Sequence, residues 1–135
     1  MARSLRKEPK FYFYDHALVE GEGARLENIV ANALIKELNF LEDTQGVTGN
    51  IHYLRTKDGK EIDFLIDLDS IATHLIEVKM SDGKPANGFR HFGALFPDAV
   101  HLQVVKNLSR DTSLPNGLLI KKLVPWLAEL ALVRE

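Results

Sequence analysis

Hydrophobic residues recur at helical spacing in the first third of the chain. Between Ala24 and about Leu38, apolar side chains return every three or four positions, which places them along one face of a helix. They are Leu26, Ile29, Val30, Ala33, Leu34 and Leu38. This stripe predicts an amphipathic helix over residues 24–38, followed by a polar loop from Glu42 to Asn50.

The next segment carries the clearest hairpin signal of the sequence. Residues 51–56 and 61–67 are strand-like and flank Asp58-Gly59, a favoured pair for a two-residue hairpin turn. Such a turn fixes the register of the two strands that it joins. It places Lys57 opposite Lys60, Arg55 opposite Ile62, Tyr53 opposite Phe64, and Ile51 opposite Ile66.

The rest of the chain alternates between strands and helices. The remaining predicted elements are strands over 73–79, 100–105 and 118–121, a helix over 84–96, and a last helix from Pro125 through Leu132. Upstream, Phe11–Tyr14 reads as a short aromatic strand, and residues 1–10 read as a basic N-terminal arm that we expect to be disordered. The order predicts a single α/β domain, residues 1–135, with a mixed β-sheet and flanking helices.

Composition narrows the class of protein. A length of 135 residues fits one domain, and a net charge of −2 excludes a strongly basic nucleic-acid coat but not a local basic patch. The absence of cysteine excludes disulfides, thiolate zinc sites and cysteine nucleophiles. Because no apolar run approaches the ~18 residues of a membrane span, and residues 1–10 lack a signal-peptide core, we expect a cytoplasmic protein without a membrane partner.

Three charged residues stand in otherwise aliphatic strands. Asp63 lies in the middle of Glu61–Ile66, and Glu77 and Lys79 flank Val78 in the next strand. A buried charge is costly unless it is paired or bound to a metal. Glu77 and Lys79, two positions apart, project from one face of the strand about 6–7 Å from each other. If the two strands are neighbours, Asp63 lies beside Glu77.

Glu27 supplies a third carboxylate to this set. At ~100° per residue it falls inside the apolar stripe of the first helix, so its side chain should lean toward the sheet. Three carboxylates and a lysine suit phosphodiester hydrolysis assisted by Mg²⁺ or Mn²⁺, because these ions prefer oxygen ligands. Asp63, Glu77 and Glu27 are the candidate metal ligands, and Lys79 is placed to orient water or to balance charge on the phosphate.

The pattern Glu27, Asp63, Glu77-Val78-Lys79 resembles the PD-(D/E)XK nuclease superfamily. The resemblance implies a restriction-endonuclease-like αβββαβ core in which Asp63 and Glu77 bind the metal, Lys79 is the catalytic lysine, and Glu27 assists from the helix. Ile62 stands where the proline of the family name would be. The implied substrate is nucleic acid, with DNA favoured over RNA. The resemblance also implies a homodimer, because many enzymes with this pattern dimerise.

A closer resemblance extends over most of the chain. The segments Phe11–Asp15, Leu26–Val30, Tyr53–Thr56, Glu61–Phe64 and Ile76–Lys79 occur in this order. Together they are similar to the uncharacterised nuclease-like domain found C-terminal to prokaryotic AAA-type ATPase domains. The chain has no phosphate-binding GxxxxGK[ST] loop, since Ser81–Lys84 lacks the first glycine at the required spacing. The resemblance implies an ATPase domain as a partner, not an ATPase activity.

Other interpretations of the same residues stay open. A Glu-x-Lys pair on a strand is often only solvated surface charge, and His52 is more often a partly exposed strand residue than part of a site. The basic residues Arg55, Lys57, Lys60, Lys84 and Arg90 either contact phosphates or serve solubility. The alternative function is a catalytically weak or inactive accessory module that binds DNA or protein for a partner ATPase. A toxin–antitoxin or defence role is a further alternative.

Overall fold

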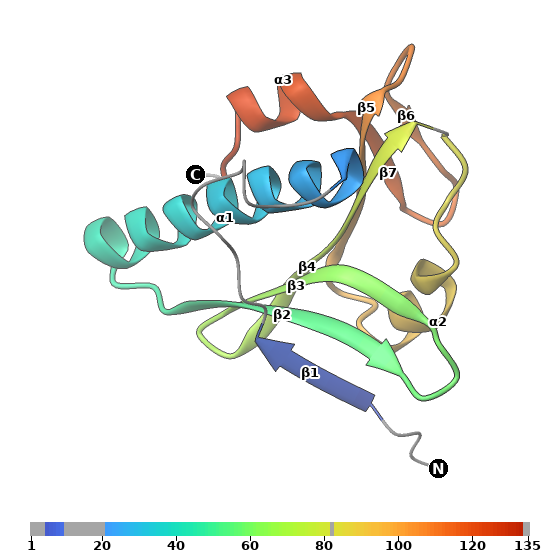
Figure 1. Ribbon diagram of the computed structural model, residues 1–135. Coiled ribbons are helices and arrows are strands. Elements are labelled where there is room, and N and C mark those ends of the chain that lie inside the picture. The colour runs from blue at the N-terminus through green and yellow to red at the C-terminus, as the bar shows by residue number, and fades with distance from the viewer. Residues whose placement is uncertain (1–4, 10–20, 82, 134–135) are drawn as a thin grey trace.

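The computed structural model describes residues 5–9, 21–81 and 83–133 (Figure 1). The helices are α1 (Glu22–Gln45), α2 (Gly88–Leu95) and α3 (Leu123–Ala128). The strands are β1 (Leu5–Pro9), β2 (Gly49–Thr56), β3 (Glu61–Leu68), β4 (Ile71–Ser81), β5 (Val100–Asn107), β6 (Thr112–Ser113) and β7 (Leu119–Lys122). The predicted α/β class is confirmed, and the order α1-β2-β3-β4-α2-β5 is consistent with a restriction-endonuclease-like core.

In the described part of the chain, seven strands form one mixed sheet in the order β1-β2-β3-β4-β5-β7-β6. Strands β1 to β4 are antiparallel, whereas β5 runs parallel to β4 and β7 parallel to β5. The parallel pair β4–β5 requires a crossover connection, and α2 lies in it. Strand β4 is therefore the place where the sheet changes from antiparallel to parallel.

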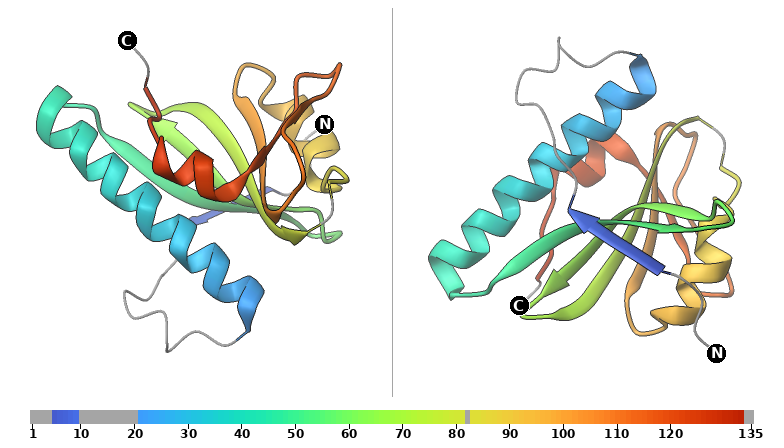
Figure 2. Two further views of the ribbon diagram at one scale, coloured as in Figure 1. Left: turned by 90° about the horizontal axis from the view of Figure 1, so that it is seen from above. Right: turned by 60° about the horizontal axis from the view of Figure 1, so that its bottom comes forward.

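The helices cover both faces of the sheet. On one face, α1 and the α3 region pack on a cluster that includes Phe64, Ile76 and Val104. On the other, Phe89 and Phe92 of α2 pack with a second cluster on the opposite side of the same strands. Figures 1 and 2 show α3 beside α1, away from α2. Burial on both faces explains the nearly continuous apolar run of β5.

Several element boundaries differ from the prediction. Helix α1 continues beyond Leu38 because Leu41 prolongs the apolar stripe into the core, and it ends at Gly46, whose φ of 69° is left-handed. The last helix spans 123–128, not 125–132, and the chain after it is held by a hydrogen bond from the Leu132 N–H to Glu37 Oε2 (3.0 Å).

At the N-terminus, residues 5–9 were expected in a disordered arm, and that expectation is wrong for them. They form β1, which pairs with β2 along Leu5–Pro9. In Figure 2, right, β1 is the dark blue arrow next to β2. The predicted strand Phe11–Tyr14 lies outside the described residues.

The hairpin between β2 and β3 has a longer loop than predicted. Thr56 pairs with Lys60 through the Thr56 N–H and the Lys60 carbonyl (2.9 Å), so the loop contains three residues, Lys57 to Gly59. Gly59 has φ 91°, as expected at the end of a three-residue hairpin loop. The extra residue places Arg55 opposite Glu61, so the predicted pairing of Arg55 with Ile62 is wrong.

A β-bulge then restores the predicted register. Leu54 pairs with Ile62 but His52 pairs with Leu65, so Tyr53 faces two residues, Asp63 and Phe64. Beyond the bulge Ile51 lies opposite Ile66, as predicted. In a regular strand, residues 62 and 64 would share a face, but here Ile62 packs on the α2 side and Phe64 on the α1 side. The bulge thus falls on the candidate residue Asp63.

The first residue of α2 tests how closely this helix packs on β3. A Cβ atom at Gly88 would lie 1.9 Å from the carbonyl oxygen of Glu61, which is backbone and cannot move aside cheaply. We expect Gly88→Ala to lower the free energy of unfolding by about 2 to 3 kcal/mol, measured by urea denaturation. Gly23→Ala, with nothing within 4 Å in α1, is the control and should be neutral or stabilising. Equal stability of the two variants would contradict the close packing.

Candidate functional site

Strands β3 and β4 part at the position of the candidate acids. Their described pairs run from Leu68 and Ile71 to Phe64 and Ile76 and stop there. Beyond that point β3 stays paired with β2, and β4 stays paired with β5. The sheet therefore opens between the β2–β3 hairpin tip and the C-terminal end of β4.

Two carboxylates replace the missing ladder bonds where the strands part. The N–H of Asp63 donates to Glu77 Oε1 (3.0 Å), and the N–H of Val78 donates to Asp63 Oδ2 (2.9 Å). Buried backbone amides need such acceptors. The prediction that Asp63 lies beside Glu77 on neighbouring strands is confirmed.

Glu77 is the electrostatically strained member of this pair. Burial, which is the largest cause, together with the Asp63 charge and a hydrogen bond between the two carboxyl groups, raises the pKa of Glu77 to about 8. The N–H of Asp63 and the charge of Lys79 act in the opposite direction without outweighing these effects. Near neutral pH the two carboxyl groups therefore hold a proton between them.

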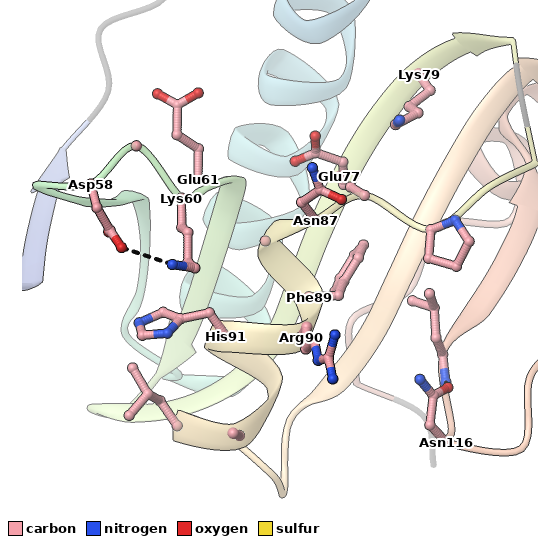
Figure 3. A pocket seen from close by; sticks show the side chains of 17 residues that line it. Asp58, Lys60, Glu61, Glu77, Lys79, Asn87, Phe89, Arg90, His91 and Asn116 are labelled. Atoms are coloured by element: carbon pink, nitrogen blue, oxygen red, sulfur yellow. Dashed lines mark hydrogen bonds and ion pairs between the residues drawn. The ribbon is translucent and has the colours of Figure 1, made fainter.

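An open cleft of about 1370 Å³ lies over the place where the sheet opens. We define it by the hairpin tip Asp58–Glu61, by Glu77 and Lys79 of β4, by Pro85–His91 at α2, and by Asn116 and Leu118. Ala94 and Leu95 complete its α2 wall. Glu77 and Lys79 thus face the same cleft, as their spacing predicted, and Figure 3 shows both side chains on β4. Lys79 makes no hydrogen bond or ion pair with a residue of the described part.

Gln103 is a residue of this site that sequence reasoning missed. It stands opposite Glu77 on β5, is fully buried, and holds the chain that enters α2. Its Oε1 accepts the N–H of Ala86 (2.9 Å), and its Nε2 donates to the Lys84 carbonyl (2.7 Å). These bonds keep residues 84–86 non-helical, so the predicted helix over 84–96 is shortened to α2. The available signal was a lone amide within the apolar run of β5.

Glu27 is not among the residues that line the cleft. It lies half-buried in the second turn of α1. Across residues 5–9, 21–81 and 83–133, no group of three His, Asp or Glu side chains converges as a metal site would require. The pair that the structure assembles is Asp63 with Glu77.

The basic residues divide into two groups. Lys60 and Arg90 line the cleft, whereas Arg55, Lys57 and Lys84 do not. Lys60 forms an ion pair with Asp58 (2.8 Å), which lowers the pKa of that carboxyl. Arg55 lies over the ring of Tyr53, 5.8 Å from its centroid. Three further polar residues, Asn87, His91 and Asn116, also line the cleft, and no motif or spacing in the sequence marked them as part of a site.

His52 lies elsewhere on the sheet. Its Nε2 is 2.7 Å from Asp67 Oδ2, and Asp67 Oδ1 also accepts the side-chain amide of Asn50 (3.1 Å). This cross-strand cluster belongs to the end of the β2–β3 hairpin that is distant from the turn. The interpretation of His52 as a strand residue outside the site agrees with these contacts.

The raised pKa of Glu77 makes folding stability depend on pH. Between its ordinary value of 4.5 and about 8, the unfolded chain releases a proton that the folded chain keeps, so stability falls as pH rises through this window. Without divalent ions, we expect the free energy of unfolding to be about 2 to 4 kcal/mol lower at pH 8 than at pH 5 through this group. Urea denaturation at both pH values measures the difference.

Glu77→Gln should remove this pH dependence, because glutamine still accepts the Asp63 N–H but does not ionise. Glu42→Gln, an exposed position on α1, is the matched control and should behave as the unaltered chain does. Identical pH profiles for Glu77→Gln and the control would contradict the assignment.

Comparison with known proteins gives one family. Among the described helices, none is long and apolar enough to cross a membrane. No curated protein and no solved structure matches the chain. A family described as a domain of unknown function, DUF4143, matches residues 22–125, a range that contains α1, strands β2 to β7, the cleft and α2. By this match over most of its length, the chain belongs to the DUF4143 family of domains.

Proposed function

We propose that this domain is a nuclease of the PD-(D/E)XK type that hydrolyses phosphodiester bonds of nucleic acid, with Mg²⁺ or Mn²⁺ as cofactor. DNA is the favoured substrate. The observation that carries the proposal is the bonded pair Asp63–Glu77, set where β3 and β4 part, with Lys79 in the same cleft. Two bonded acids and a lysine on adjacent strands, with Glu77 and Lys79 lining a large groove, are the arrangement that the family resemblance implies.

The donor set fits a hard divalent cation. Mg²⁺ is commonly held by one or two carboxylates, with water and phosphate oxygens in its remaining positions. Asp63 and Glu77 would hold it, and its charge would take the place of the proton that the two acids now hold. Once bound, such an ion polarises the phosphate and lowers the pKa of its water. Glu27 remains a proposed third carboxylate from α1.

The residues of the chain have separable tasks in this proposal. Lys79 places an ammonium beside the carboxylate pair, where it orients the attacking water or offsets charge on the phosphate. Lys60 at the hairpin tip and Arg90 on α2 both line the cleft and contact the nucleic-acid backbone. These contacts go to phosphates and carry no sequence information, so the proposed cleavage is not base-specific.

A second function, the accessory module, is favoured by one observation. Asp63 and Glu77 each already accept a hydrogen bond from a backbone N–H. These bonds hold the two side chains in place without a metal ion. A domain that kept this fold while serving a partner AAA-type ATPase, by binding DNA or protein, would show the same contacts. Metal binding and cleavage separate the two functions.

Conservative substitutions test the catalytic proposal without removing the structural hydrogen bonds. Asp63→Asn and Glu77→Gln keep an acceptor oxygen for each backbone N–H but cannot carry the negative charge that a metal ion would require. Each of the three single variants, Asp63→Asn, Glu77→Gln and Lys79→Met, should reduce Mg²⁺-dependent cleavage of plasmid DNA at least about 100-fold. Asp43→Asn, exposed on α1, should cleave as the unaltered chain does.

Cleavage that survives in Asp63→Asn would point to a contaminating enzyme and sink the nuclease assignment. Isothermal titration with Mn²⁺ completes the test. An unaltered chain that neither binds Mn²⁺ nor cleaves would favour the accessory module.

The cleft lining also predicts which basic side chains bind the phosphates of nucleic acid. Arg90 lies in the cleft wall and forms no ion pair with a described residue, so its guanidinium is placed for phosphate. We expect Arg90→Ala to weaken DNA binding about threefold to tenfold and to lower the salt dependence by about one counterion. Fluorescence anisotropy over a range of salt concentrations measures both, with Lys36→Ala on α1 as the control. An unchanged salt slope in Arg90→Ala would show that the strand lies elsewhere.

A further inference from the structure

Asn87 immediately precedes α2, at the position where an asparagine normally caps a helix. A capping residue adopts an extended backbone, and its side chain accepts an N–H of the first helical turn. Asn87 instead has φ −60° and ψ −31°, and its side chain makes no capping hydrogen bond. The side-chain amide of Asn87 therefore forms no hydrogen bond with the first turn of α2.

The backbone on both sides of Asn87 is held in place. Before it, Gln103 binds the Lys84 carbonyl and the Ala86 N–H with its two amide atoms. After it, Gly88 is pressed so closely on the Glu61 carbonyl that no side chain fits there. The backbone of Asn87 is therefore held on both sides, and this fixes where its side chain leaves the chain at the cleft wall.

The side chain of Asn87 is directed toward Glu77 in the close-up of the cleft (Figure 3). It is an exposed residue of the cleft wall, which it shares with Glu77 and Lys79. In Figure 3 its amide group points toward the Glu77 carboxyl group. No hydrogen bond joins its amide to another residue of the described part. An amide offers two donors and adds no charge, so it can stand beside acids and still bind an anion.

We propose that Asn87 is a further substrate-contacting residue, whose side-chain N–H donates to a non-bridging oxygen of the backbone phosphate next to Glu77, and that Gln103 is the positioning residue that holds it there. The inference rests on the proposed function, because it takes nucleic acid as the substrate of the cleft. It adds a neutral donor between the acids and the cations Lys60 and Arg90.

The ordinary alternative is that Asn87 is only a solvated turn residue, since asparagine is common in such positions. Asn87→Ala separates the two, because an exposed side chain without a structural hydrogen bond can be removed with little effect on folding. The probe is a short double-stranded DNA oligonucleotide in Ca²⁺, so that affinity is measured without turnover. Asn39→Ala, an exposed asparagine of α1, is the matched control.

We expect Asn87→Ala to weaken DNA binding about tenfold, the effect of one charge-assisted hydrogen bond, and to leave Mn²⁺ affinity within about twofold. Asn87→Asp introduces a carboxylate that repels the phosphate. It should therefore weaken DNA binding further without weakening Mn²⁺ binding. Asn87→Ala with the DNA affinity of the control would overturn the inference. An equal loss of Mn²⁺ affinity would also overturn it, since Asn87 would then be a metal ligand.

Gln103→Leu tests the positioning role through non-additivity. If Gln103 acts by holding Asn87, its loss should weaken DNA binding in the unaltered chain but add nothing in Asn87→Ala. Additive losses would show that Gln103 acts independently of Asn87 and would overturn its positioning role.

Failure of the inference and failure of the proposed function are distinguishable. If Asp63→Asn abolishes cleavage but Asn87→Ala changes neither affinity nor rate, the nuclease stands and the Asn87 contact falls. If the unaltered chain binds DNA through Asn87 but neither binds Mn²⁺ nor cleaves, the contact stands and the nuclease falls.

Discussion

The structure depends on the exchange of hydrogen bonds between Asp63 and Glu77 at the place where β3 and β4 part. A sheet that opens must satisfy the amides that lose their ladder partners, because a buried N–H without an acceptor costs about 1 to 3 kcal/mol. Here the acceptors are carboxylates rather than carbonyls. That choice allows the hairpin to diverge from β4, makes room for α2 and its cleft, and leaves two acids together in a half-buried place. The fold and the candidate chemistry therefore arise from the same contacts.

The position of this opening is set by the hairpin loop. A three-residue loop from Lys57 to Gly59 shifts the pairing of β2 and β3 by one residue, and the bulge opposite Tyr53 shifts it back. Without the bulge, the hydrophobic residues of β3 that follow Asp63 would change face relative to Ile62. With it, Ile62 and Phe64 lie on opposite faces and Asp63 occupies the turning point between them. A β-bulge next to a functional residue is a common way to redirect a side chain.

The sequence predicted local features well and distant contacts poorly. Period and turn residues placed α1, the hairpin and the strand with Glu77 and Lys79, and neighbouring strands brought Asp63 to Glu77 as expected. The loop length was missed because Asp58-Gly59 suits both two-residue and three-residue loops. In α1 the stripe favoured Ile29, yet Ile29 is 39% exposed while Asn28 is 3% exposed. The roles of Gln103 and Gly88 could not be predicted from the sequence, because they depend on contacts with residues far along the chain.

The proton shared by Asp63 and Glu77 connects these observations to the proposed function. Two acids held together by backbone amides cannot both ionise at little cost, so near neutral pH the folded chain keeps a proton between them. A divalent cation in that position would neutralise both charges and release the proton. Binding would then be favoured by higher pH and would offset the stability that the ionised pair costs, since a ligand that binds only the folded state stabilises it. In a chain of net charge −2, neutralising these two acids is also what would allow a phosphate to approach the cleft.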